Sequence, residues 1–421
     1  MKIMWIANLP LPEMADRIGL NTPMGGWLTA LSGHLKKLDD IEFVYCFPQA
    51  RTKSLIRKKI GKVMFYGFYE DMGSLIYDEK LEKVLKAIYI LEEPDIVHIF
   101  GSEYYHAYAA VKSGIDLNKV VISIQGIMSL IAKHYCTGIS IKDRLLPYRD
   151  RSGRIGCLEK EKERYEIHGQ YEDYVLRHIK FFEGRTDFDK AYVTLLNPSG
   201  KYFKCNRILR KKFYEGQWRI ETCEQYSIFL SQASYPVKGL HIFLQAVNML
   251  KALIPTVKVY IGGENICAGK TYSPYGRYIK RIMKEYQLES TICFLGSLQE
   301  EKMWEQYLKV NVFVLPSVIE NSPNSLAEAM ILGVPCIAAD VGGVSSMLEH
   351  TKEGYIYRVD EPHMLAYYLY EIMQNQELAQ SFSVNARERA LQEFDEIANT
   401  QKVVEMYRDI MEQRKKVESH G

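Results

Sequence analysis

Hydrophobic positions along the chain fall into short apolar runs, and amphipathic stretches of helical length separate these runs. From residue 226 onward the runs are YSIFLS, VKVYIG, ICFLG, VFVLP and PCIAA. In the first third they are KIMWIA, EFVYCF, DIVHIF and VVISIQ, with helices expected to start near Gly26, Asp78 and Glu103. Strands that alternate with helices indicate a parallel sheet covered on both faces. The pattern therefore predicts an α/β protein with two doubly wound, Rossmann-like domains.

Segments with a different pattern join the two halves. Residues 142–182 are dense in charge and tyrosine, which predicts one or two long surface helices, and the run AYVTLL at 191–196 predicts a strand. Residues 201–219 mix aromatic and basic side chains without a clear period, so we place the linker within about 205–222. The expected divisions are 1–212 for the N-terminal domain, 220–387 for the C-terminal domain and 388–421 for a final helical segment.

The end of the chain is expected to be almost purely helical. After Asp360 the pattern leads into an amphipathic helix over about 388–411. Its apolar stripe recurs at helical spacing, so it must be buried against another part of the protein. The stripe consists of Ala390, Leu391, Phe394, Ile397, Val404 and Tyr407.

Composition narrows the choice of partners and compartment. Lys and Arg total 54 and Asp and Glu total 52, a formal charge of +2, so no overall field would hold nucleic acid or an anionic membrane. The eight cysteines form no CxxC pair and several lie in apolar runs, which favours reduced core thiols over a disulfide framework or a zinc site. The sequence shows neither a secretory signal region nor an apolar stretch of about 18 residues. We therefore expect a cytoplasmic protein.

The segment VFVLPSVIENSPNSLAEAMILGVPCIAADVGG, residues 312–343, is the most informative. After its buried strand, Ser322 is expected to cap a helix that runs from Pro323 to Leu332 and stops at Gly333. Proline suits the first helical position because that amide has no helical partner. The segment thus predicts a strand, a loop, a short helix and a second strand.

Two glutamates flank the start of this predicted helix. Glu320 stays on the loop, while Asn324 and Glu328 are four residues apart and share one helix face. Amide hydrogens near residues 322–325 would point at an anion, and each carboxylate could accept paired hydrogen bonds from vicinal hydroxyls. Such a set could hold a diphosphate flanked by two polyols. The alternative is a strand-helix-strand unit with two solvated glutamates.

The stretch PSVIENSPNSLAEAMILGVPCIAADVGG resembles the signature of family 4 glycosyltransferases of the GT-B fold. In that signature two glutamates are separated by seven residues and followed by a small-residue helix, Gly-x-Pro, a strand and Gly-Gly. The resemblance implies that Glu328 binds the ribose hydroxyls of a nucleotide-sugar and that Glu320 binds hydroxyls of the transferred sugar. The backbone implied to lie near the phosphates and the donor includes Asn321, Ser322, Asn324 and Ser325.

A second element, FLSQASYPVKGLHIFLQAV at 229–247, resembles the family's first C-terminal strand, loop and helix. The resemblance implies that Lys238 and Gly239 meet the diphosphate. The position that commonly holds an arginine is Gln232 here, and an amide can hydrogen-bond a phosphate but cannot neutralise it. Charge compensation therefore rests on Lys238. The resemblance makes Glu320, Lys238 and Gln232 the expected catalytic residues.

Weaker resemblances complete the expected donor site. VKVYIGGEN and ICFLGSLQEEKMWEQYLKV resemble the family's strand-Gly-Gly and Leu-Gly segments, which implies that Leu298 lies at the base pocket. NTPMGGWLTALSGHL resembles the glycine pair that faces the phosphates across the cleft, which places Gly25 and Gly26 there.

Three residues of the first half are candidates for the acceptor side. Glu103 and His106 follow the run DIVHIF and should lie where the cleft is, so we expect them to contact the acceptor. Gln125 stands where the family often has a histidine after the fourth strand, so a role in polarising the sugar is changed or absent. His98, inside the apolar run, is expected to be a satisfied core histidine.

No metal site is expected. Asp187 and Asp189 form a DxD, the manganese-binding mark of the other large glycosyltransferase fold, but they precede AYVTLL instead of following a strand. We expect them to cap a helix, with Arg185 or Lys190 as partner. The donor would be a substrate, and no cofactor is implied.

The sequence as a whole predicts a GT-B glycosyltransferase. The resemblance implies transfer of a sugar from a nucleotide diphosphate-sugar to a glycan or lipid-linked glycan, with retention of anomeric configuration, in bacterial surface-polysaccharide or capsule synthesis. It also implies that the final helix returns to the N-terminal domain. The basic run at 51–62, with Leu55, Ile56 and Ile60, suggests a peripheral contact at the inner membrane face. A catalytically silent glycan-binding or nucleotide-sugar-binding protein and a sugar-nucleotide epimerase remain the alternatives.

Overall fold

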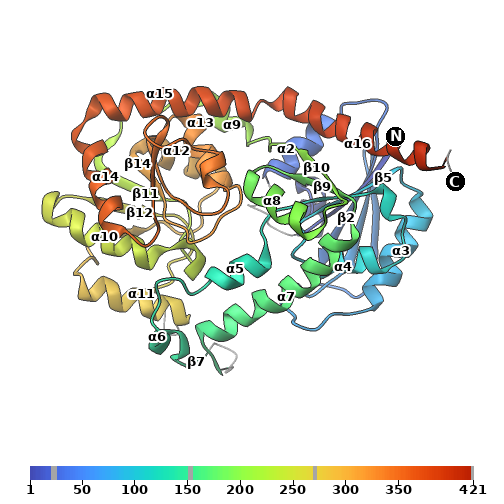
Figure 1. The fold of residues 1–421 in the computed structure, drawn as a ribbon, viewed down its shortest axis with the longest axis horizontal. Coiled ribbons are helices and arrows are strands. Elements are labelled where there is room, and N and C mark those ends of the chain that lie inside the picture. The colour runs from blue at the N-terminus through green and yellow to red at the C-terminus, as the bar shows by residue number, and fades with distance from the viewer. Residues whose placement is uncertain (20–25, 150–154, 269–272, 419–421) are drawn as a thin grey trace. The chain divides into compact units, whose positions relative to one another are not determined.

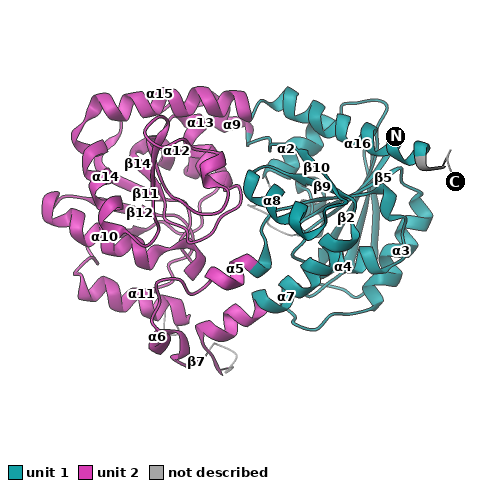
Figure 2. Cartoon of the chain, in the orientation of Figure 1, with its two compact units in different colours: residues 1–129, 165–210, 394–421 teal, residues 130–164, 211–393 magenta. Residues whose placement is uncertain are grey.

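The protein forms two compact units in a computed structural model that describes residues 1–19, 26–149, 155–268 and 273–418 (Figures 1 and 2). Unit 1 consists of residues 1–129, 165–210 and 394–421, and unit 2 consists of residues 130–164 and 211–393. Each unit is built around its own sheet of mainly parallel strands. The two doubly wound domains predicted from the sequence are therefore present.

Unit 1 contains an eight-stranded sheet of order β10-β9-β6-β5-β1-β2-β4-β3, in which only β3 pairs antiparallel, with β4. Its strands are β1 (Lys2–Ala7), β2 (Glu42–Gln49), β3 (Ile56–Ile60), β4 (Val63–Tyr69), β5 (Ile96–Phe100), β6 (Val120–Ser123), β9 (Phe181–Gly184) and β10 (Lys201–Lys204). Its helices are α1 (Pro12–Ala15), α2 (Gly26–Leu35), α3 (Lys80–Glu92), α4 (Tyr105–Lys112), α8 (Asp187–Leu196), α16 (Glu396–Glu418) and the short 3-10 helices η1 (Asp16–Ile18) and η2 (Leu117–Lys119).

Unit 2 contains a six-stranded parallel sheet of order β13-β12-β11-β14-β15-β16. Its strands are β11 (Glu224–Leu230), β12 (Lys258–Ile261), β13 (Ile292–Phe294), β14 (Val310–Leu315), β15 (Cys336–Ala339) and β16 (Gly354–Tyr357), and β7 (Tyr148–Arg149) pairs with β8 (Ile155–Gly156). Its helices are α6 (Ile141–Leu145), α9 (Lys211–Glu215), α10 (Leu240–Leu253), α11 (Pro274–Glu285), α12 (Glu300–Lys309), α13 (Asn324–Leu332), α14 (Pro362–Gln374), α15 (Gln376–Glu393) and the 3-10 helices η3 (Pro236–Lys238) and η4 (Val344–Ser346), while α5 (Met128–His134) and α7 (Leu158–His178) each run from one unit into the other.

The strand expected at 191–196 was a wrong prediction, because those residues form the second half of α8. Thr186 caps this helix, and Asp189 completes a capping box with the Thr186 backbone. Asp189 and Val193, four residues apart, are the buried positions of α8, so the buried positions follow a helical period and not the alternation of a strand. The expected capping role is confirmed for Asp189, which also accepts from the Arg185 backbone amide at 3.0 Å.

The boundaries between the units also differ from the expected divisions. Residues 130–164 group with unit 2, although they were assigned to the N-terminal domain. Residues 211–222 are not a free linker, because α9 lies there and Trp218 is buried in unit 2. The Trp218 indole donates to the Val310 carbonyl at 2.7 Å. A large aromatic side chain with a satisfied polar atom anchors this segment to the unit it precedes.

The expected C-terminal helix is two helices, α15 and α16, that meet at residues 394–395. Of the predicted stripe, Ala390, Phe394, Val404 and Tyr407 are buried. Leu391 and Ile397 are 40% and 66% exposed, respectively. The break changes the helical phase, so one continuous stripe could not describe both helices.

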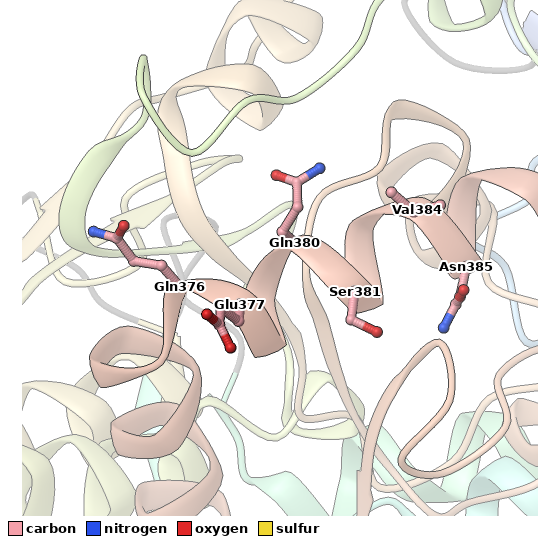
Figure 3. Close-up of a pocket in the computed structure, with 6 residues that line it drawn as sticks. All are labelled: Gln376, Glu377, Gln380, Ser381, Val384 and Asn385. Carbon is pink, nitrogen blue, oxygen red and sulfur yellow. The ribbon is translucent and has the colours of Figure 1, made fainter.

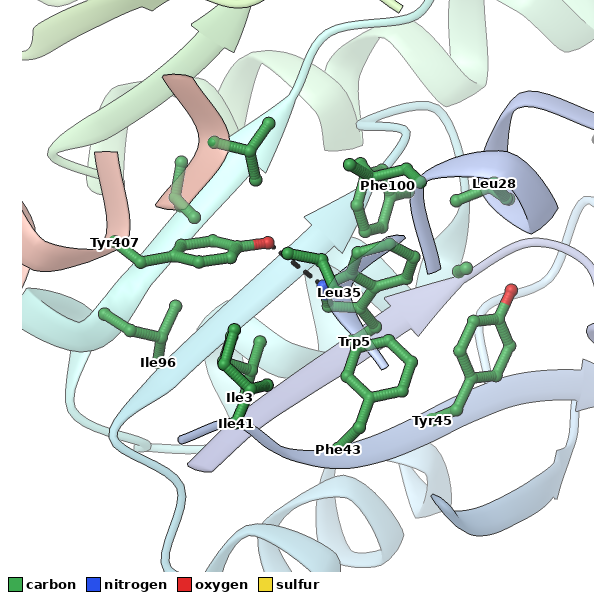
Figure 4. Packing of buried hydrophobic residues seen from close by; sticks show 14 of the residues in the cluster. Ile3, Trp5, Leu28, Leu35, Ile41, Phe43, Tyr45, Ile96, Phe100 and Tyr407 are labelled. Carbon is green, nitrogen blue, oxygen red and sulfur yellow. Dashed lines mark hydrogen bonds between the residues drawn. The ribbon is translucent and has the colours of Figure 1, made fainter. Parts of the chain in front are cut away.

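Within unit 1, helix α16 packs against the sheet through Tyr407, which is fully buried. The Tyr407 hydroxyl accepts from the Trp5 indole at 3.0 Å (Figure 4). It also lies 2.7 Å from Nδ1 of His98. The other ring nitrogen of His98 lies 2.7 Å from the Ser123 hydroxyl, which confirms His98 as a satisfied core histidine. Burial lowers the pKa of His98, and contact with Glu183 opposes this effect. Side chains of α2, α16 and the central strands form one apolar cluster on this face of the sheet (Figure 4).

All eight cysteines are free thiols, as expected. Most are buried, whereas Cys293 is exposed. Burial raises the pKa of Cys136 to about 11, so its thiol form is favoured. Over the described part of the chain, every helix is too short or too polar to cross a membrane.

We expect Tyr407→Phe to destabilise the protein, because it leaves the Trp5 indole and a His98 ring nitrogen without a partner. Each unpaired buried polar group costs about 1 to 3 kcal/mol. Urea unfolding of Tyr407→Phe and of Tyr370→Phe, an exposed tyrosine of α14, measures the difference. Equal midpoints for the two variants would contradict the anchoring role of Tyr407.

Candidate functional site

The sheet order of unit 2 places the candidate functional residues at the carboxyl ends of its two central strands. Strands β11 and β14 are neighbours at the centre of the sheet, and the chain proceeds from them toward opposite edges. In open parallel sheets, ligands bind outside the carboxyl ends of the strands at this switch point. Lys238 and Gly239 follow β11, and Glu320 and Asn321 follow β14. The topology therefore brings together segments that lie about 80 residues apart in the sequence.

Lys238 and Glu320 form an ion pair at this switch point. The Lys238 ammonium lies 2.5 Å from Oε1 of Glu320, and the side chains are 18% and 13% exposed. The Ser317 hydroxyl donates to the same oxygen at 2.8 Å. Burial alone would lower the pKa of Lys238, but the charge of Glu320 and the neighbouring Tyr235 outweigh burial and raise this pKa. The ammonium is therefore charged at any physiological pH.

Two glycines allow the paired loops to approach so closely. Gly239 has φ +67°, and a Cβ at this position would lie 1.8 Å from the Pro316 carbonyl oxygen. Gly342 has φ +54°, and a Cβ there would lie 1.8 Å from the Glu320 carbonyl oxygen. The next residue, Gly343, donates its amide to that oxygen at 3.0 Å. Gly239 thus lets the loops after β11 and β14 approach each other, and the glycines after β15 meet the backbone of Glu320.

The loops after β12 and β13 are joined in the same way. Gly263 donates its amide to the Gly296 carbonyl at 2.8 Å, and both residues have positive φ. Leu298, expected at the base pocket, is half-buried two residues further on. Gln232 is exposed, and its amide donates to the Ser234 hydroxyl at 3.3 Å.

Helix α13 begins one residue later than expected. Pro323 is the cap residue and has extended backbone, and no side chain caps the helix, so Ser322 does not have the predicted capping role. The helix ends at Gly333, as expected, with φ +75°. Asn321 and Glu328 are 6% and 9% exposed. Ser322, Asn324 and Ser325 are half-buried.

The carboxyl edge of the unit 2 sheet combines groups of complementary chemistry. It presents an ammonium group, two carboxylates and the amide end of a helix along one sheet edge. An anion would be favoured at the helix start and at Lys238. Hydroxyl groups would be favoured at the carboxylates. The arrangement suits a ligand that carries both phosphate and polyol groups.

The corresponding edge of unit 1 also has a switch point, between β1 and β5. Gly25 lies outside the described residues. Gly26 is the first residue of α2, and the Arg210 side chain lies so close that a Cβ on Gly26 would be 2.5 Å from it. The adjacent Arg207 guanidinium stacks on Trp27 at 3.0 Å from the ring centroid. This edge therefore carries cationic groups beside α2.

Two carboxyl groups of unit 1 have raised pKa values: Glu103, which follows β5, and Glu172, which lies on α7. Glu103 directly follows β5, and burial raises its pKa to about 7. Burial also raises the pKa of Glu172 on α7 to about 8, and the nearby Glu103 adds to this shift. The Ser102 hydroxyl and the Met128 amide donate to the two oxygens of Glu172 at 2.5 and 2.6 Å. Both acids therefore hold protons close to neutral pH.

His106 and Gln125, the other acceptor candidates, lie deeper than expected. His106 is fully buried, and its Nδ1 lies 2.7 Å from Oε2 of Glu70. Its imidazole thus orients another side chain and does not reach the surface. Gln125 is half-buried just beyond β6. Within the described ranges, no cluster of three or more His, Cys, Asp or Glu residues could hold a metal ion.

Several residues of these sites were not expected from the sequence. Ser317 lies within residues 312–343, and its position three residues before Glu320 could have predicted a contact between them. Arg207 lies in the basic run at 201–219, where its burial could not be distinguished from a solvated face. Glu172 lies on α7, and the sequence did not distinguish it from the many other charged residues of that helix. Only tertiary packing identifies the last two.

The chain is similar in sequence to known glycosyltransferases. Residues 211–389 match the sequence family described as glycosyl transferases group 1. A putative colanic acid biosynthesis glycosyltransferase of Salmonella typhimurium is 26% identical over 180 residues, which are 41% of this chain and 42% of that protein. N-acetyl-alpha-D-glucosaminyl L-malate synthase of Bacillus anthracis is 28% identical over 210 residues, half of each chain. The chain thus spans half or less of the length of these two curated relatives.

Solved structures with the same fold match nearly the whole chain. Sucrose-phosphate synthase of Thermosynechococcus elongatus superposes with a TM-score of 0.69 at 16% identity, over 98% of this chain and all of that one. Anabaena HepE in complex with UDP-glucose superposes with a TM-score of 0.66 at 15% identity, over 97% of this chain and all of that one. These structures confirm the predicted GT-B fold.

The raised pKa values of Glu103 and Glu172 predict that their contribution to stability falls as pH rises. Their folded pKa values lie above the unfolded values, so the stabilisation is complete below about pH 4.5 and is lost as pH rises through about 8. Each unit of pKa difference corresponds to about 1.4 kcal/mol. Urea midpoints between pH 5 and 8.5 measure this loss.

Glu172→Gln should flatten this pH dependence, because an amide is neutral at every pH in the range. Glu405→Gln, at an exposed position of α16, is the matched control and should behave as the wild type. A Glu172→Gln protein with the full wild-type slope would show that another group titrates.

Proposed function

Because residues 211–389 form a glycosyl transferases group 1 domain in a chain with the GT-B fold, we propose that the protein transfers a sugar from a nucleotide diphosphate-sugar to a hydroxyl of a glycan. The reaction belongs to polysaccharide biosynthesis, the setting named for the colanic acid enzyme and for the amylovoran glycosyltransferase of Erwinia amylovora. The observation that carries this proposal is the Lys238–Glu320 ion pair at the switch point of unit 2.

The donor lies along the carboxyl edge of the unit 2 sheet in this proposal. Lys238 and the amide end of α13 offset the charge of the diphosphate, which stabilises it further as it leaves. Glu320 accepts hydrogen bonds from the transferred sugar, and Glu328 accepts them from the ribose. Ser317 orients the Glu320 carboxylate. Gln232 adds a neutral donor near the phosphates in place of an arginine.

A uridine diphosphate donor and a lipid-linked acceptor are the finer parts of the proposal. HepE was solved with UDP and with UDP-glucose. An Escherichia coli relative, 25% identical over 101 residues, is named as a galactosyltransferase acting on GlcNAc-diphosphoundecaprenol. We further propose that the anomeric configuration is retained, which NMR of the product anomeric proton would decide.

The edge strand β3 suits a contact with an anionic lipid surface. Arg57, Lys58 and Lys59 are exposed in consecutive positions of β3. Leu55, just before the strand, is 44% exposed. A basic strand flanked by an apolar side chain combines electrostatic attraction with a small apolar contact. A lipid-linked acceptor would be reached from such a surface.

We expect Glu328→Ala to weaken donor binding at least tenfold, because hydrogen bonds to a charged group contribute about 1.5 to 3 kcal/mol each. Isothermal titration with UDP-glucose measures this loss. Glu377→Ala, at an exposed position of α15, is the control and should bind as the wild type. Equal donor affinity for the two variants would contradict the assignment of Glu328 to the donor site.

Transfer should not require a metal ion, because Lys238 and helix amides offset the diphosphate charge. Release of nucleoside diphosphate in the presence of acceptor should persist in excess chelator. Loss of this release, restored by manganese, would contradict the proposal. Acceptor-dependent release also separates a transferase from an epimerase and from a silent binding protein, neither of which produces free nucleoside diphosphate from the donor and acceptor.

A further inference from the structure

A cavity lies in unit 1, beside the segment after β5 that contains Glu103 and His106. Its volume is about 400 Å³, and it is enclosed by the end of β4, the loop at 71–78, the start of α3 and Tyr105 at the start of α4. Cavities of this size hold small ligands. A hollow on α15 is lined by residues of that helix alone, such as Gln376 and Asn385 (Figure 3), and no described atom there is buried without a partner.

Two buried side chains that line the unit 1 cavity carry polar atoms without a partner among the described residues. Glu70 is 6% exposed, and its Oε1 is buried and unpaired. Tyr105 is 3% exposed, and its hydroxyl is also buried and unpaired. Buried polar groups in native proteins are usually hydrogen-bonded, and leaving one unpaired is unfavourable. A ligand with hydroxyl groups would satisfy both atoms.

The Glu70 carboxylate is held in place from its other side. Nδ1 of the fully buried His106 lies 2.7 Å from Oε2 of Glu70. This contact fixes the carboxylate and leaves Oε1 as its unpaired oxygen. A pre-oriented acceptor loses little freedom on binding.

Tyrosine rings form a rigid wall of the cavity. Tyr77 lines it beside Tyr105, with ring centroids 5.6 Å apart. Tyr77 also packs edge-on against Tyr108 at 5.0 Å and donates its hydroxyl to Glu82 at 2.8 Å. The ring is therefore held by contacts on α3 and α4. An aromatic side chain so placed offers an apolar surface next to polar groups.

The charge of the lining excludes anions. Glu70, Asp71 and Asp78 are acidic, and no Lys, Arg or His is among the described lining residues. A phosphate or a uronic acid would be repelled here. An uncharged ring with many hydroxyls matches both the unpaired acceptor and the aromatic wall, since a carboxylate accepts hydrogen bonds from hydroxyl groups.

We propose that this cavity binds an uncharged sugar unit of the acceptor glycan, with Glu70 as the residue that selects against acidic sugars. The identification of the ligand as acceptor rests on the proposed function. The cavity then binds a unit of the glycan through Glu70 and Tyr105, while the donor is held by unit 2.

Saturation-transfer NMR on the full chain tests this proposal. The probes are an equimolar set of the methyl α-pyranosides of glucose, galactose and mannose, the methyl glycoside of glucuronic acid, and tetramethylammonium. At least one neutral glycoside should show saturation transfer and the glucuronide should show none. Glu70→Gln should weaken that binding at least tenfold, and Tyr105→Phe should weaken it to a smaller extent. Glu79→Gln, an exposed acid next to the cavity loop, should bind as the wild type.

Each other result overturns the proposal. The cavity is not a sugar site if no neutral glycoside binds, if tetramethylammonium binds and the glycosides do not, or if Glu70→Gln and Glu79→Gln bind equally. The circular dichroism spectrum of Glu70→Gln shows whether the variant is folded, and Tyr105→Phe gives an independent result if it is not. Failure of the proposed function is distinct: the neutral glycoside would bind through Glu70 while the wild type released no nucleoside diphosphate from any donor.

Discussion

The ion pair between Lys238 and Glu320 is the contact on which the arrangement of unit 2 depends. It joins the loops after β11 and β14, the two strands at which the sheet order reverses. A partly buried pair is stabilising only when its remaining hydrogen-bonding groups are satisfied. Here Ser317 contributes a hydrogen bond, and the close contacts at Gly239 and Gly342 hold both backbones in place. The side chains that hold the loops together are also those to which we assign the charged donor in the proposed function.

The switch point of unit 1 carries a different set of charged and titratable groups. Its edge gathers buried acids, Glu103 and Glu172, near stacked or packed arginines, Arg207 and Arg210. Burial keeps the acids protonated near neutral pH and lowers the pKa of Arg207. Such an edge offers neutral hydrogen-bond donors beside cationic groups.

The sequence predicts the parts of this structure that depend on local pattern. Apolar runs bounded by helical segments identified the central strands of both sheets, and the segment at 312–343 identified Glu320 and its neighbours. Residues 191–196 of α8 were predicted to be a strand because their short apolar run, AYVTLL, has no distinctive period. The capping box that marks the start of the helix involves a backbone contact. Glu70 and Tyr105 could not be found from the sequence, because their role depends on which polar atoms remain unpaired after folding.

A double-mutant cycle on the ion pair tests the central claim most directly. UDP-glucose is titrated calorimetrically into the wild type, Lys238→Met, Glu320→Gln and the double variant. If the two side chains form one donor-binding unit, each single change should weaken binding tenfold or more. The double change should then cost less than the sum, with a coupling of about 0.5 to 3 kcal/mol. Unchanged affinity in either single variant, or strictly additive losses, would contradict the account.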